Sequence, residues 1–215
     1  MELTENKILS KVFMWMFIGL AITFGVGYYV SSNANMLYNI FAKSYFLLII
    51  SELAIVFVLT LFIRKLPPIV AKTMFVVYSL LTGLTFSAIF VVYDLTSIIY
   101  VFAITSVVFL IFSLLGHYTK INLSGLGTYL LMALIAIIIA SVINIFVGSE
   151  TLNLGITIVG ILVFIAYVAY DVNMIKNSMM DIDEENLAIY WALQLYLDFI
   201  NLFIRLLRLL GKQKN

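Results

Sequence analysis

The sequence predicts an all-α integral membrane protein with seven transmembrane helices, because of its composition and its long apolar runs. Of the 215 residues, 64% are hydrophobic and only 11% are charged, and the mean hydropathy is +1.16. A soluble domain of this length needs far more charge on its surface. We therefore expect lipid to be the solvent for most of the chain, and residues 1–215 to form a single transmembrane domain.

Seven runs of about 20 apolar residues have the length of a membrane-spanning helix. The first run has no small-residue cleavage site after it, so we expect it to be retained as a span and not removed as a signal peptide. The runs cover approximately Val12–Val30, Ser44–Ile63, Ile69–Tyr93, Ser97–Gly116, Gly125–Val147, Leu154–Ile175 and Leu187–Leu209.

Each connection between these runs contains residues that interrupt an apolar helix. A polar segment at 31–39 separates the first two spans, and a basic pair followed by two prolines at 64–68 ends the second span. Asp94 predicts a tight turn after the third span. The later connections are polar segments at 117–124 (HYTKINLS), 148–153 (GSETLN) and 176–186 (KNSMMDIDEEN).

The distribution of lysine and arginine predicts a cytoplasmic N-terminus, because these residues concentrate in cytoplasmic loops. The odd-numbered connections hold only Lys43. With a cytoplasmic N-terminus, a seventh span would place the basic residues at the end of the last helix on the opposite side of the membrane. The last helix therefore either crosses the membrane against this rule, or enters it and returns to the same side. Its apolar run of about 22 positions favours crossing. The N-terminus and the even-numbered connections hold Lys7, Lys11, Arg64, Lys65, Lys72, Lys120 and Lys176.

The last predicted helix carries a polar stripe in otherwise apolar surroundings. An ionisable side chain at that depth costs on the order of 3 kcal/mol or more when it faces lipid, so the stripe should face protein or water. We therefore expect this helix at the centre of the bundle, ringed by the other six. The stripe has the helical spacing i, i+4, i+7 and i+11 and consists of Gln194, Asp198, Asn201 and Arg205.

Three acidic residues lie inside predicted spans: Glu52, Asp171 and Asp198. Carboxyl groups within a membrane commonly mark an ion pathway or a proton relay, although a protonated carboxyl group can also serve only to hold helices together. Asp171 and Asp198 lie on consecutive antiparallel helices, at depths that differ by roughly 5–10 Å. The spacing leaves open whether these two side chains meet.

If the two carboxyl groups meet, they form a proton-controlled site. Like charges in a low dielectric cannot both ionise readily, so the pair titrates as a unit. The protonated pair would tie its two helices together, whereas the ionised pair would repel itself and attract a hard cation such as Ca²⁺, which prefers oxygen ligands. Asp171 and Asp198 are therefore candidates for a gate and for a calcium site, and Glu52, Gln194 and Asn201 are candidates to line the path or contact the cation.

Other classes of function find no support in the sequence. It has no H-E-x-x-H, G-x-S-x-G or P-loop motif, and the absence of cysteine excludes thiolate metal sites and disulfides. The formal net charge of +1 and the lack of a basic run give no sign of a nucleic-acid partner. We expect no enzymatic activity and no cofactor.

Three stretches resemble the transmembrane Bax inhibitor motif family, specifically its bacterial YetJ-like branch. They are residues 160–175 (GILVFIAYVAYDVNMI), 193–211 (LQLYLDFINLFIRLLRLLG) and 118–130 (YTKINLSGLGTYL), the last with Asn122 where an acid is usual. The resemblance implies a seven-helix fold with a central last helix and a pH-sensitive calcium leak. It also implies that Asp171 and Asp198 come together as a proton-sensing dyad, and that Arg64 is a candidate latch to the first aspartate.

The expected function is a calcium leak channel, closed when the Asp171–Asp198 pair is protonated and opened by its deprotonation. The expected location is the bacterial inner membrane, and the expected partners are the lipid bilayer, H⁺, and Ca²⁺ as the permeant or bound ion. One alternative is a regulatory membrane protein that binds a protein partner such as a membrane protease. Another is a proton-coupled cation exchanger, which would use the same acids.

Overall fold

The computed structural model describes residues 2–177 and 183–214. Within these residues, seven helices are long and apolar enough to cross a membrane, and no β-strand occurs. The predicted all-α, seven-helix fold is therefore confirmed. In chain order the elements are α1 (Glu2–Ser31), α2 (Ala34–Asn39), η1 (Ile40–Ser44), α3 (Tyr45–Phe62), η2 (Ile63–Lys65), α4 (Pro68–Val92), α5 (Leu95–Tyr118), η3 (Ser124–Leu126), α6 (Gly127–Val147), α7 (Glu150–Lys176) and α8 (Glu184–Leu210).

The first connection differs from the prediction, because most of the polar segment 31–39 is helical. Asn33 caps α2: its side chain accepts a hydrogen bond from the Met36 N–H at 3.1 Å. No glycine or proline interrupts residues 34–62, so the helix passes through the π-helical turn η1 into α3. The second candidate span therefore begins at Ala34 and not near Ser44.

The chain divides into two compact units. The first comprises Met1–Asp94, Met179–Tyr196 and Gln213–Asn215, and the second comprises Leu95–Ser178 and Leu197–Lys212. Helix α8 contributes to both units, because the boundary falls between Tyr196 and Leu197. The predictions of one domain and of a central last helix ringed by the other six stay predictions. Part of the predicted 176–186 connection, residues 178–182, lies outside the described residues.

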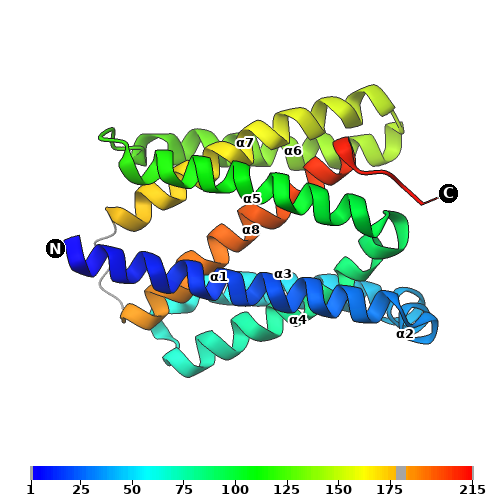
Figure 1. Cartoon of the computed structure of the whole chain (residues 1–215), viewed down its shortest axis with the longest axis horizontal. Helices are drawn as coiled ribbons and strands as arrows, with labels where there is room; N and C mark the ends of the chain where they lie inside the picture. Colours follow the sequence, from blue (N-terminus) through cyan, green and yellow to red (C-terminus); the bar gives the residue numbers. More distant parts are fainter. Residues whose placement is uncertain (1, 178–182, 215) are drawn as a thin grey trace. The chain divides into compact units, whose positions relative to one another are not determined.

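In the first unit, α1 and α3 both pack on α4, and α1 (blue) and α4 (cyan to green) run along each other in Figure 1. The α1–α4 packing is close at Gly83, where an added Cβ would overlap the side chain of Val26. The first half of α8 joins this core through Tyr196, whose ring packs edge-on against Tyr78 at 5.7 Å. The Tyr196 and Thr23 hydroxyl groups lie 2.6 Å apart.

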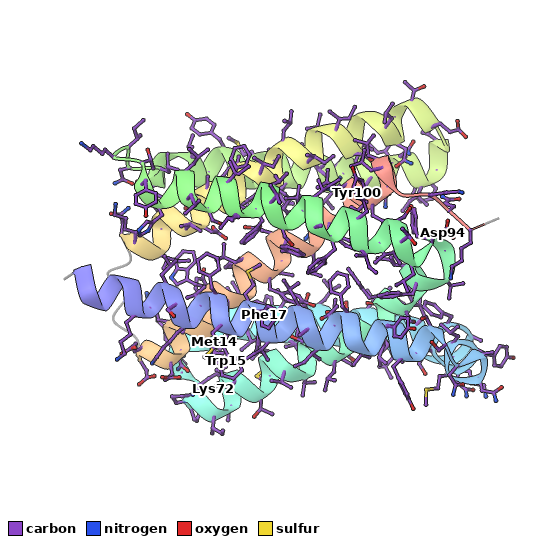
Figure 2. All side chains as sticks on the ribbon, viewed as in Figure 1. Met14, Trp15, Phe17, Lys72, Asp94 and Tyr100 are labelled. Carbon is purple, nitrogen blue, oxygen red and sulfur yellow. The ribbon has the colours of Figure 1, made fainter. Side chains whose placement is uncertain are left out.

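The start of α8 is anchored in the first unit by ion pairs. Glu185 pairs with Lys11 of α1 and with Lys72 of α4, the latter at 2.7 Å. The Lys72 ammonium group also lies 5.9 Å from the centre of the Trp15 ring, and Figure 2 labels both side chains. The N-terminal half of α1, the start of α4 and the start of α8 therefore meet at one end of this unit.

In the second unit, α7 packs against both α5 and α6. Helices α5 and α7 approach closely at Gly116, where an added Cβ would overlap the backbone of Ala169. The second half of α8 packs through Phe199 against Phe102 and Phe109, with ring centroids 5.3 and 5.6 Å apart. These contacts hold the part of α8 that carries Asp198.

Candidate functional site

The second unit brings together the two intramembrane aspartates. Asp171 on α7 and Asp198 on α8 lie within hydrogen-bonding reach of each other, and each is only 5% exposed. Helix α7 ends at Lys176 and α8 begins at Glu184, and between these helices the two side chains meet, which the spacing in the sequence left open. The arrangement is a buried pair of carboxyl groups on two neighbouring helices.

Two tyrosines of α7 surround the pair. Tyr167 interacts electrostatically with both aspartates, and Tyr170 interacts with Asp171. Tyr170 also covers Gly127 at the start of α6, where an added Cβ would lie 2.5 Å from its hydroxyl group. One oxygen of Asp198, Oδ2, is buried and has no hydrogen-bond donor among the described residues. This oxygen is available to a proton or a cation.

Asn173, which was not among the residues predicted from the sequence, connects α7 to the polar loop after α5. Its Nδ2 donates to the Gly116 carbonyl at 3.2 Å and to the Ile121 carbonyl at 3.4 Å, and its Oδ1 accepts from the Leu123 N–H at 3.0 Å. The residue is 1% exposed and lies two positions after Asp171. An asparagine in an apolar run was the available signal in the sequence.

The other predicted residues occupy different places. Glu52 is half-buried in the first unit and accepts a hydrogen bond from Thr85 at 3.1 Å. In the same unit Gln194 is half-buried on α8, and Arg64 is exposed in η2. Asn201 lies in the second unit, one turn after Asp198, and donates to its own helix at the Leu197 carbonyl. The roles predicted for these residues, including the latch at Arg64, stay predictions.

The carboxyl pair offers a cation only a small set of ligands. Within the described part of the chain, no group of three or more histidine, cysteine or acidic side chains could hold a metal ion. A calcium ion takes roughly six to eight oxygen ligands, so Asp171 and Asp198 would have to be joined by water or backbone oxygens.

The sequence matches the model of the family described as "Inhibitor of apoptosis-promoting Bax1" over residues 5–215. The chain belongs to this family. The match covers every helix that carries the carboxyl pair and its neighbours, so the resemblance seen in the sequence is confirmed. A Bax inhibitor family protein with seven apolar helices is an integral membrane protein, and its solvent is the lipid bilayer.

Relatives of this Bax inhibitor family protein cover almost its whole length. It is 42% identical over 214 residues to the inner membrane protein YbhL of Escherichia coli K12, covering 96% of this chain and 92% of the relative. It is 40% identical over 220 residues to an uncharacterized protein of Borreliella burgdorferi, covering 99% and 95%. It is 38% identical over 218 residues to an uncharacterized protein of Deinococcus radiodurans, covering 96% and 94%.

Proposed function

We propose that this protein is a pH-sensitive calcium leak channel of the bacterial inner membrane, gated by protonation of the Asp171–Asp198 pair. The observation that carries the proposal is the meeting of two buried carboxyl groups on α7 and α8. The location is supported by the relative in E. coli that is named an inner membrane protein. The N-terminus is expected in the cytoplasm, from the distribution of lysine and arginine.

In the closed state, the pair shares a proton, and the resulting hydrogen bond ties α7 to α8. Two carboxylates in contact, away from water, cannot both ionise readily, so the pair releases its proton as a unit. The burial of both side chains supports this step because it keeps water from screening the charges. The gate is therefore a single titrating element and not two independent acids.

In the open state, loss of the shared proton leaves two negative charges in contact. Their repulsion is on the order of 4 kcal/mol at an effective dielectric constant near 20. An energy of that size changes the ratio of closed to open molecules by about a thousand-fold. We propose that α8 then moves against α7, and that the ionised pair draws a hard cation into the path. Asn201, one turn along α8, is a candidate to line that path in the second unit.

The proposal is tested by calcium flux into proteoliposomes from about pH 5 to about pH 8. The flux of the unaltered protein should rise with pH, and the double variant Asp171→Asn with Asp198→Asn should lose this pH dependence. Glu150→Gln is the matched control, because Glu150 is an exposed acid at the start of α7, and it should behave as the unaltered protein does.

Two results would overturn the channel proposal. Folded protein that carries no calcium at any pH would leave a regulatory role with a protein partner as the remaining reading. Calcium movement that requires an opposing proton movement would identify an exchanger instead, since a leak needs no counter-ion.

A further inference from the structure

The second unit contains a polar cavity that the carboxyl pair does not account for. Its volume is about 530 Å³, within the roughly 300–1,000 Å³ of small-molecule sites. It lies among α6, α7 and the end of α8, and its remaining lining residues are isoleucines. The polar lining residues are Ser141, Asn144, Asn153, Asn201, Arg205 and Arg208.

The charge of this cavity is positive. Arg205 and Arg208 lie three residues apart on α8, so their guanidinium groups repel each other across one helical turn. In the described part of the chain, neither arginine forms an ion pair with a carboxylate, and no acidic side chain lines the cavity. An anion between them would relieve this repulsion.

Arg205 is held in place with hydrogen-bond donors to spare. Its guanidinium group packs against Gly160, where even a Cβ would overlap it, and lies 5.3 Å from the centre of the Phe164 ring. Its NH1 donates to the Ile156 carbonyl at 3.1 Å. Its Nε is buried and has no acceptor among the described residues. Burying such a donor without a partner is costly, and a small shift of the guanidinium group toward an anion in the cavity would relieve this cost.

The amide NH₂ groups of two neighbouring asparagines make no hydrogen bond among the described residues. Asn144 Oδ1 accepts from the Ser149 N–H at 3.1 Å, and Asn153 Oδ1 accepts from Arg208 at 3.4 Å. Because both amide oxygens have donors, both NH₂ groups remain for a ligand. Two guanidinium groups and two amide NH₂ groups make a donor set that suits the oxygens of a phosphate group, which arginine binds with paired hydrogen bonds.

The position of the cavity matches the depth of lipid headgroups. Asn144 and Asn153 flank the connection between α6, which ends at Val147, and α7. Ile145, which also lines the cavity, is 78% exposed, so apolar surface adjoins the polar lining at the end of a membrane-spanning helix. The phosphate of an anionic phospholipid could enter here with its acyl chains along α6.

We propose that this cavity binds a phosphate group, presented either by an anionic phospholipid headgroup or by inorganic phosphate, with Arg205 and Arg208 as its principal donors. The site shares Asn201 with the proposed calcium path, but phosphate binding at the two arginines does not depend on the carboxyl pair being a gate. It would fix the end of α8 to α6 and α7 when it is occupied.

The test uses the full-length protein, freed of lipid in a neutral detergent, and measures binding by native mass spectrometry and by the shift in melting temperature. The probes are phosphatidylglycerol, phosphatidylcholine and inorganic phosphate. Removing one charged donor should weaken binding by roughly ten-fold or more. The variants are Arg205→Gln, Arg208→Gln and the control Lys120→Gln, which removes the same charge from an exposed loop position.

We expect phosphatidylglycerol to bind more tightly than phosphatidylcholine, with the affinity reduced by Arg208→Gln and unchanged by Lys120→Gln. Binding of inorganic phosphate with the same variant pattern, but no preference for phosphatidylglycerol, would assign the site to the free anion. Equal binding by the arginine variants and the unaltered protein would overturn the site. Arg208 is exposed, so its variant decides the question even if Arg205→Gln fails to fold.

Discussion

The Asn173 side chain on α7 forms hydrogen bonds to the polar loop that follows α5. Replacing Asn173 with alanine is therefore expected to lower the free energy of unfolding. The side chain is buried and makes three hydrogen bonds to backbone groups of Gly116, Ile121 and Leu123. Each such bond contributes about 1 kcal/mol net, and a buried group left unpaired costs about 1–3 kcal/mol. We therefore expect a loss of about 2–4 kcal/mol.

For a chain of this length, the loss corresponds to a fall in melting temperature of about 5–15 °C. The assay is thermal unfolding of purified protein in detergent. Asn39→Ala is the matched control, because Asn39 is exposed and its side chain makes no capping hydrogen bond. The control should melt within a degree or two of the unaltered protein. Equal melting of Asn173→Ala and the unaltered protein would refute the reasoning.

Two further pairs of substitutions test the packing within the two units, one pair in each. Gly116→Ala places a methyl group against the backbone of Ala169 and should destabilise the protein by about 1–3 kcal/mol. Gly125→Ala is the control and should leave the stability unchanged, because its methyl group meets open space. Similar melting temperatures of the two variants would contradict the close approach of α5 and α7. Thr23→Val removes the hydroxyl group that bonds the buried Tyr196 hydroxyl and donates to the Ser79 carbonyl, and should cost about 1–3 kcal/mol. Adding Tyr196→Phe to the Thr23→Val variant should lower the stability little further, because the hydrogen bond between the two side chains is already lost. If the double variant lost as much stability in thermal unfolding as the two single variants together, the hydrogen bond would be contradicted.

Hydropathy predicted the seven spans because a helix that crosses a membrane needs a long apolar run. Such a run can be recognised in the sequence whichever helices it packs against. Hydropathy did not predict α2, because Asn33 and its polar neighbours are typical of a loop until the side chain caps a helix. Helical periodicity placed Asp198, Asn201 and Arg205 on one stripe, and all three contribute to the site or the cavity of the second unit.

Helical periodicity did not show at which depth in the membrane each of these side chains lies. The predicted span ended at Ile175, one residue before the observed end of α7 at Lys176. A helix end does not show how α7 and α8 pack, and this packing decides whether Asp171 reaches Asp198. The polar cavity was also unpredictable, because the residues that hold Arg205, at Gly160 and Ile156, are roughly 50 positions away in the chain and meet it only through tertiary packing.

The central claim is that one proton, shared by Asp171 and Asp198, closes the calcium path. The most direct test follows the infrared band of the protonated carboxyl group in proteoliposomes, while calcium flux is measured on the same sample as pH rises. We predict that the band disappears and the flux appears at the same pH, and that Asp171→Asn with Asp198→Asn abolishes both changes. Flux that rises while the carboxyl band stays constant would contradict the claim.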